Sequence, residues 1–153
     1  MTLSTASGFH VRPAVEADVA AVRSLLVQLG YDLAPAEVRR RLAAVMASPD
    51  HAVLAGESDG RVIGLLHLYV RPALEKPPEV IVQALVVDAA NRKGGIGRTM
   101  MAAAESWARD RGLKSVALAS HVAREDAHAF YAALGYERVA TSHLLRKVLD
   151  PCG

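Results

Sequence analysis

Residues whose types and spacing suit a specific chemistry are concentrated in residues 85–98. The segment reads Leu85-Val86-Val87-Asp88-Ala89-Ala90-Asn91-Arg92-Lys93-Gly94-Gly95-Ile96-Gly97-Arg98. Its apolar start predicts a strand, its glycines a tight turn, and its end the start of a helix. Glycine lets the backbone approach a ligand closely, and the first N–H groups of a helix lack intrahelical partners at the positive end of its dipole. With three basic side chains, the pattern predicts a site for phosphate groups.

Several kinds of nucleotide carry phosphate groups that such a site could bind. The segment is not a Walker loop, because no Gly-Lys-Ser/Thr closes it, and Gly94-Gly95-Ile96-Gly97 lacks the spacing of the dinucleotide fingerprint G-x-G-x-x-G. The structural alternative is a strand-to-helix turn without a ligand. The basic residues at the same place favour the phosphate site.

A second segment carries an aromatic pair on an expected helix and reads Ala127-His128-Ala129-Phe130-Tyr131-Ala132-Ala133-Leu134-Gly135-Tyr136. Tyr131 has two interpretations. An aromatic at helical spacing with other apolar residues is commonly a core residue. A phenol with an unperturbed pKa of about 10 is also protonated at neutral pH and can act as a general acid.

The pattern Arg92-x-x-Gly95-x-Gly97 after an apolar strand, together with Phe130-Tyr131-x-x-Leu134-Gly135-Tyr136, resembles the GCN5-related N-acetyltransferase (GNAT) family. The resemblance extends over nearly the whole chain. It implies the GNAT-like acyl-coenzyme A N-acyltransferase fold, acetyl-coenzyme A as the acyl-donor cosubstrate, and direct attack of a primary amine on the thioester.

The resemblance also implies roles for individual residues. The loop and helix start wrap the pyrophosphate of the cosubstrate with backbone N–H groups, and a bulge in the preceding strand pairs with the pantetheine arm. A main-chain N–H of that strand polarises the thioester carbonyl, and one such donor can contribute roughly 2.7–4 kcal/mol. Tyr131 protonates the departing thiolate. The residues expected to bind the cosubstrate are Leu85, Val86, Val87, Arg92, Lys93, Gly94, Gly95, Ile96, Gly97 and Arg98.

The general base is left open. Many family members carry an acid where this chain has Gln83 or Ala84, and neither side chain can accept a proton. Glu79, His67 and His121 remain as candidates, as does a water chain to solvent; histidine has an unperturbed pKa near 6.5. An asparagine that commonly contacts the cosubstrate is replaced by Arg124, which could bind a phosphate or the acceptor.

Periodicity predicts the elements that position these residues. Helices are expected at residues 19–29, with Gly30 as the C-terminal left-handed residue, and at 35–47, with Pro35 in the first turn and Met46 among the inward residues. Further helices are expected at 94–111 and 125–134. Strands are expected at 9–12, 51–57, 61–70, 79–87, 115–119, 136–139 and 143–148.

The strands at 51–57 and 61–70 form a hairpin, because Ser58-Asp59-Gly60 between them contains an Asp-Gly turn signal. The strand at 115–119 is expected to be buried. The resulting order, β-α-α-β-β-β-α-β-α-β-β, predicts an α/β fold with a mixed sheet and helices on its faces. Without repeats or a linker, residues 1–153 are interpreted as a single N-acetyltransferase domain.

Composition excludes several classes. A chain of 153 residues with 52% hydrophobic residues is too apolar to be disordered, and no apolar run is long enough for a membrane helix. The net charge of +2 argues against a nucleic-acid binder. The histidines lack metal-ligand spacing and a single cysteine, Cys152, makes no internal disulfide, so no metal and a cytoplasmic location are expected.

The sequence therefore predicts an N-acetyltransferase that moves the acetyl group of acetyl-coenzyme A to a primary amine of a small molecule or peptide. The alternative is a non-catalytic acyl-coenzyme A binding or sensing module, which the missing strand acid and Arg124 suggest. The family resemblance implies that the acceptor site lies at roughly residues 30–36 and 138–143. Tyr31, Asp32 and Glu37 could attract a cationic amine such as a polyamine, an aminoglycoside or a peptide N-terminus. The amine, the acyl-chain preference and a homodimer, common in the family, stay open.

Overall fold

The computed structural model describes residues 3–4 and 8–151, so Cys152 lies outside the described part. The chain divides into two compact units, Met1–Ala119 and Ser120–Gly153, which are described separately. The first unit holds a six-stranded sheet in the order β1-β2-β3-β4-β5-β6. Its strands are β1 (Leu3–Ser4), β2 (Phe9–Pro13), β3 (His51–Ser58), β4 (Arg61–Arg71), β5 (Glu79–Val87) and β6 (Val116–Leu118).

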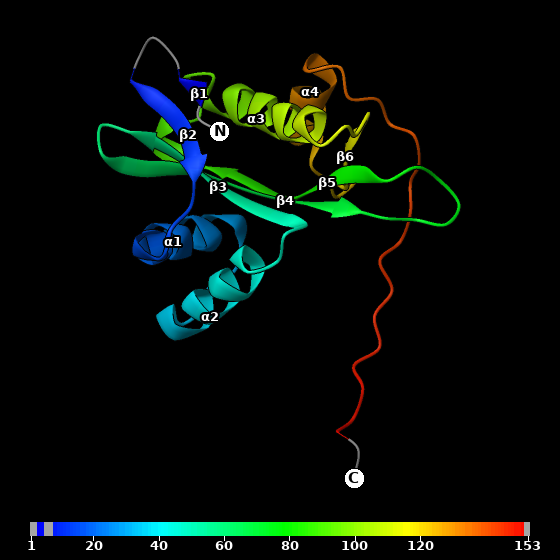
Figure 1. Cartoon of the computed structure of the whole chain (residues 1–153), viewed down its shortest axis with the longest axis horizontal. Coiled ribbons are helices and arrows are strands. Elements are labelled where there is room, and N and C mark those ends of the chain that lie inside the picture. The colour runs from blue at the N-terminus through cyan, green and yellow to red at the C-terminus, as the bar shows by residue number, and fades with distance from the viewer. Residues whose placement is uncertain (1–2, 5–7, 152–153) are drawn as a thin grey trace. The chain divides into compact units, whose positions relative to one another are not determined.

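The sheet is mixed, as predicted, because the first four strand pairs are antiparallel and β5 runs parallel to β6. Helices α1 (Val19–Leu29) and α2 (Pro35–Met46) cover one face, here called the α1/α2 face, and α3 (Ile96–Asp110) covers the other (Figure 1). The α1/α2 face carries a continuous apolar cluster. Its buried members are Ala14, Val19, Val22, Leu25, Val38, Leu42, Val53, Ala55, Leu65 and Val86.

Local signals located α1 and α2 correctly. Gly30 ends α1 in the left-handed region at φ 107°, and its N–H donates to the Val27 carbonyl at 3.0 Å. Pro35 opens α2 as expected. The prediction that Met46 points inward was wrong, because its side chain in the last turn is 42% exposed.

The hairpin of β3 and β4 was also predicted correctly. Its turn residues Asp59 and Gly60 both have positive φ, at 50° and 76°, which suits a two-residue hairpin turn. Ser58 and Arg61 form the closing pair. This hairpin places β4 beside β5, and β5 leads into the glycine loop.

Strand β5 has two different edges. Along β4 it is paired over its whole length, with an irregularity that leaves Gln83 without a register partner. Along β6 it is paired only at Val80, Ile81 and Val82. Within the described residues, the β6 side of residues 83–87 therefore has no strand partner. The predicted buried strand at 115–119 is shorter, Val116–Leu118, and only half-buried.

The second unit contains α4 (Glu125–Ala133), followed by Gly135 at φ 91°. The predicted strands at 136–139 and 143–148 were wrong, since residues 134–151 carry no regular secondary structure. Val139, Leu144 and Val148 are accordingly exposed. Alternating apolar residues show which side of a strand could be buried, but a strand also needs a hydrogen-bonding neighbour. No such neighbour pairs with this segment among the described residues.

Candidate active site

The glycine loop connects the end of β5 to α3 through the 3-10 turn η2 (Ala89–Asn91). Gly95 precedes α3 in the left-handed region, with φ 76° and ψ 13°. A Cβ built on Gly95 meets no atom within 4 Å, so the space beside it is open. Glycine is needed there for the backbone conformation, and the open space lets a ligand approach the main chain.

The start of α3 presents free hydrogen-bond donors. The first intrahelical bond runs from the Thr99 N–H to the Gly95 carbonyl at 3.1 Å. The N–H groups of residues 96–98 therefore have no hydrogen-bond acceptor within the helix. Ile96 is buried and fixes the turn, while Lys93 and Arg98 are exposed. Backbone donors and the positive end of the helix dipole thus lie together at the start of α3, with two exposed basic residues close by in the sequence, an arrangement that suits phosphate.

Arg92 is held against the strand that precedes the loop. Its Nε donates to the Val87 carbonyl at 3.0 Å, and the residue is otherwise exposed. This bond fixes one side of the guanidinium while the Nη groups stay available for an anion. Arg92 therefore lies where β5 ends and the loop begins, as the sequence predicted.

A residue that sequence reasoning missed fixes the start of the loop. The Gln28 side chain on α1 donates from Nε2 to Asp88 Oδ1 at 2.8 Å and accepts the Ala89 N–H on Oε1 at 2.9 Å. The Asp88 N–H donates to the Ile63 carbonyl on β4 at 2.8 Å. Nothing in the local sequence around Gln28 indicates this contact, because its partners lie 60 and 61 residues away.

The open edge of β5 contains Leu85, Val86 and Val87, the residues expected along the pantetheine arm. The bulge was expected within this segment, whereas the irregularity of β5 lies at Gln83, just before it. Val86 is buried against the α1/α2 cluster. The strand is therefore anchored by packing on one face, and residues 83–87 have no strand partner on the β6 side among the described residues.

Two of the candidate bases lie in the first unit, in different surroundings. Glu79 forms ion pairs with Arg71 and Lys76 and accepts a hydrogen bond from the Ser115 hydroxyl at 3.1 Å. These contacts stabilise the sheet at the start of β5. His67 contacts His51, with 2.9 Å between its Nε2 and His51 Nδ1. Burial, reinforced by the charge of His51, lowers the pKa of His67 to about 4. His67 is thus a neutral imidazole at physiological pH.

In the second unit, Tyr131 lies on α4 between two aromatic rings. The ring centroids of Phe130 and Tyr136 are 5.0 and 6.0 Å from that of Tyr131, both edge-on. Burial raises the pKa of the Tyr131 phenol, and the charge of Arg124 opposes that shift. The phenol therefore stays protonated well above neutral pH, as a general acid requires.

The remaining candidates of the second unit have structural contacts. Arg124 directly precedes α4. His121, the third candidate base, accepts the Ala123 N–H on Nδ1 at 3.2 Å, and its carbonyl contacts His128 Nε2 at 2.9 Å. Both histidines thus stabilise the turn before α4. Among the described residues, no group of three or more His, Cys, Asp or Glu side chains could hold a metal ion.

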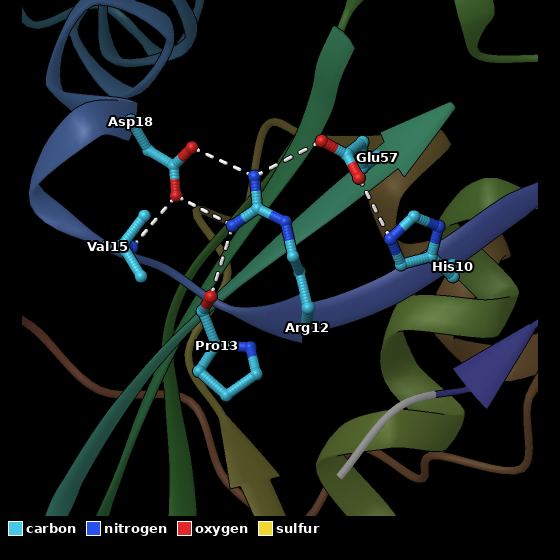
Figure 2. A network of polar contacts seen from close by, with 6 residues as sticks. All are labelled: His10, Arg12, Pro13, Val15, Asp18 and Glu57. Carbon is cyan, nitrogen blue, oxygen red and sulfur yellow. Dashed lines mark hydrogen bonds and ion pairs between the residues drawn. The ribbon is translucent and has the colours of Figure 1, made fainter. Parts of the chain in front are cut away.

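A network of charges that sequence reasoning also missed fixes α1 to the sheet (Figure 2). Arg12 donates from Nη1 and Nη2 to both carboxylate oxygens of Asp18, at 2.8 and 2.9 Å, and Asp18 also accepts the Val15 N–H. Glu57 joins Arg12 to His10. The Arg12 hydrogen bonds lower the pKa of the buried Asp18 carboxyl. The network borders a cavity of about 430 Å³ that Gln28 and Asp88 also line.

Comparisons with known proteins agree with this geometry. The sequence profile of the Acetyltransferase (GNAT) family matches residues 19–136. The chain is 33% identical to an aminoglycoside N(6')-acetyltransferase type 1 of Stenotrophomonas maltophilia, over 95% of this chain and 97% of that protein. It is 30% identical to the enzyme of the same name from Klebsiella aerogenes, over 91% and 96%.

A solved structure of the aminoglycoside N-acetyltransferase AAC(6')-Iy in complex with coenzyme A shares the fold, with a TM-score of 0.84. It is 19% identical and covers 95% of this chain and 98% of its own. No helix among the described residues is long and apolar enough to cross a membrane. The family resemblance drawn from the glycine loop and the Tyr131 segment is confirmed. The chain belongs to the acetyltransferase (GNAT) family and is an acetyl-coenzyme A dependent N-acetyltransferase whose acceptor is an amine.

Proposed function

We propose that the acceptor is a primary amine of a small cationic amino compound, with an amino sugar of the aminoglycoside type as the first candidate. The observation that carries this proposal is the identity of 33% and 30% to two aminoglycoside N(6')-acetyltransferases over more than 90% of each chain. These matches span nearly the whole of this chain and of each relative, rather than the glycine loop alone.

The linker between α1 and α2 supports a cationic acceptor. Asp32 is 81% exposed, and its nearest cation, Arg23 Nη2, is 3.4 Å away. The Tyr31 ring beside it is 59% exposed and can stack on a sugar or a cation. Glu37 contributes less than the sequence suggested, because Arg40 and Arg41 already neutralise it.

The residues of the glycine loop fit the phosphates of acetyl-coenzyme A, which supplies the acetyl group as a thioester. The N–H groups of residues 96–98 and the side chains of Arg92, Lys93 and Arg98 hold the pyrophosphate. The free edge of β5 at Leu85, Val86 and Val87 holds the pantetheine arm, and one of its N–H groups polarises the reacting carbonyl. Gly94, Gly95 and Gly97 keep the approach to the backbone open.

Tyr131 is the general acid in this proposal. Its support is the match of the family profile across residues 19–136, which includes Tyr131, and the raised pKa of its phenol. The two units then serve one acetyltransferase domain, residues 1–153. A cytoplasmic location is consistent with a sequence that contains one cysteine and so makes no internal disulfide.

The experiment is thiol release from acetyl-coenzyme A by the purified full chain, with an aminoglycoside, a polyamine and a peptide with a free N-terminus as acceptors. We expect the aminoglycoside to give the highest kcat/KM, and mass spectrometry of its product to show one added acetyl group. A preference for the peptide contradicts the amino-sugar proposal.

The same assay decides between enzyme and binding module. Titration calorimetry with coenzyme A is run in parallel. Coenzyme A binding without thiol release for any acceptor contradicts catalysis and supports a sensing module. Sedimentation of the same sample, with and without coenzyme A, determines whether a homodimer forms.

A further inference from the structure

A cluster of three ring side chains lies at one end of the α1/α2 face. His51 on β3 stacks on Tyr69 of β4, with 5.1 Å between ring centroids and 16° between ring planes. His51 Nδ1 and His67 Nε2 are 2.9 Å apart. His51 is paired with Tyr69 and is a diagonal neighbour of His67, whose own partner is Val53. Diagonal residues on one face of antiparallel strands are within reach of long side chains.

The cluster lies beside the irregular point of β5. His67 is paired across the sheet with Ala84, and the next pair, Leu68 with Val82, leaves Gln83 as the extra residue. Directly opposed side chains have Cβ atoms roughly 4.5–5.5 Å apart. Ala84 carries only a methyl group, so the ionisable side chain in register with this point of β5 is that of His67. Beyond Val82, β5 has no partner on its β6 side in the described residues.

The cluster also shares a face with the expected acceptor region. Val53 and Leu65, two residues from His51 and His67 along their strands, belong to the α1/α2 cluster. Because side chains alternate along a strand, His51 and His67 point to that same face. The linker between α1 and α2, which contains Asp32, joins the two helices that cover it.

The low pKa of His67 leaves its ring unprotonated at neutral pH but makes it a weak base, so a proton that it accepts must move on at once. Nε2 of His67 is occupied by His51, so Nδ1 is the nitrogen left to meet a substrate. The titratable groups that face His67 are His51 from β3 and Tyr69 from β4, and Ala84 faces it from β5. With a pKa of about 4, His67 offers a free lone pair at neutral pH. It cannot hold a proton for long, so it needs an outlet.

The geometry points to His67 as the group that takes the proton of the acceptor amine and to His51 as the outlet that passes it to solvent. This inference rests on the proposed function. The acceptor binds as an ammonium ion, and His67 Nδ1 accepts one of its protons while the His67 Nε2 proton moves to His51 Nδ1 and the His51 Nε2 proton is released to water. The freed lone pair forms the new N–C bond as the C–S bond breaks, and the nitrogen then loses a second proton to water. The thiolate takes one proton from its general acid, which water reprotonates, so each turnover releases one proton, and exchange with water returns both rings to their starting tautomers.

Other described groups do not serve this purpose as well. Glu79, on the same strand as Ala84, is engaged by Arg71 and Lys76 at the start of β5. Gln83, the extra residue, has no basic side chain. His67 is therefore the ionisable side chain that register places opposite the position where the strand acid is missing.

The test compares His67→Gln with wild type in the thiol-release assay at pH 7 and at pH 9.5. A general base contributes typically 100-fold or more, so we expect kcat to fall by about 100-fold at pH 7. The loss shrinks at pH 9.5, because more of the amine then arrives already deprotonated. A structural defect lowers kcat equally at both pH values. We expect imidazole added to the assay to raise the kcat of His67→Ala, and the more weakly basic pyrazole to leave it unchanged.

Two further variants separate the relay from general damage. His51→Gln lowers kcat at pH 7 with little change in KM, since His51 acts through His67. His10→Gln is the matched control, because His10 is another half-buried sheet histidine whose contact is Glu57 on β3. Coenzyme A affinity within about twofold of wild type shows that a variant is folded. If the His67 variants lose that affinity, His51→Gln decides the question.

The outcomes distinguish the relay from the proposed function. A wild type that binds coenzyme A but acetylates no amine contradicts the proposed function, and the relay with it. An active wild type whose His67→Gln and His51→Gln variants keep kcat within about threefold at pH 7 contradicts the relay alone. An equal loss at both pH values without rescue by imidazole assigns His67 to structure and also contradicts the relay.

Discussion

The Gln28 side chain on α1 holds Asp88, 60 residues further along the chain, at the point where β5 becomes the glycine loop. The same amide accepts the Ala89 N–H at 2.9 Å. A helix that packs on the sheet thereby sets the direction in which the loop leaves β5. The proposed phosphate site therefore depends on a side chain that lies outside the loop itself.

Gln28→Ala should weaken coenzyme A binding. It removes two hydrogen bonds, each contributing about 0.5–1.5 kcal/mol net, and frees the start of the loop. We expect the Kd for coenzyme A to rise by about fivefold, measured by titration calorimetry, with little loss of thermal stability. Ser24→Ala, one turn earlier on α1, is the control and should leave the Kd unchanged. An unchanged Kd in Gln28→Ala refutes the role of this contact.

Gly95→Glu should abolish measurable coenzyme A binding. A side chain at φ 76° strains the backbone by about 1–2 kcal/mol, and a carboxylate beside the N-terminus of α3 repels phosphate. The control is Gly112→Glu, at φ 72° after the other end of α3, where a Cβ also meets no atom within 4 Å. Gly112→Glu should lose about as much stability as Gly95→Glu but keep its affinity for coenzyme A. Equal affinities in the two variants contradict the phosphate site.

Tyr131→Phe should lower kcat by about 100-fold, the typical contribution of general acid catalysis, and leave the Kd for coenzyme A unchanged. Because burial raises the pKa of the phenol above 10.0, wild type should keep the acid form throughout the neutral range. Its kcat should decline only as the pH rises through that raised pKa. Full thiol release by the phenylalanine variant would show that Tyr131 is a packing residue.

Asp18→Asn should destabilise the protein at pH 7 by roughly 3 kcal/mol, because it removes the carboxylate that accepts from both Nη groups of the half-buried Arg12 and leaves Glu57, at 3.4 Å, as its carboxylate partner. The folded-state pKa of Asp18 lies below the ordinary value of 3.8. Its stabilisation is thus complete above about pH 4 and is lost as the pH falls through the lowered pKa. Urea unfolding at several pH values should show this loss in wild type but not in Asp18→Asn. Glu16→Gln, at an exposed position nearby, is the control.

Gly64→Ala should destabilise the sheet by about 1–3 kcal/mol, the usual cost of overpacking. A Cβ on Gly64 would overlap Met100 Sδ of α3, and one on Gly56 would lie 2.7 Å from the Phe9 ring. Gly64→Ala combined with Met100→Ala should lose less stability than the sum of the two single changes, since the second makes room for the first. If urea unfolding shows that the double variant loses as much stability as the two single variants together, this prediction is contradicted.

Much of the fold was predictable because its signals are local. The apolar spacing of α1 with Gly30 at its end, the Asp59-Gly60 turn of the hairpin and the bounds of β5 all follow from neighbouring residues. The glycine loop was recognisable for the same reason. Its turn, its basic residues and the helix after it are contiguous in the sequence, and backbone groups rather than distant side chains form its surface.

Tertiary structure alone decided the contacts between distant segments. Gln28 meets Asp88 because α1 packs on the sheet, and Arg12 meets Asp18 because the chain turns back between β2 and α1. His51 meets His67 through the register of β3 and β4. Nothing in each local sequence marks these side-chain partners. The strands expected at 136–139 and 143–148 do not form, because strand formation also depends on a distant segment of the chain. Their alternation is local, whereas a strand exists only when another backbone supplies its hydrogen bonds. The sequence thus determined the helices, the hairpin and the glycine loop, and the tertiary structure determined which strands pair and which side chains meet.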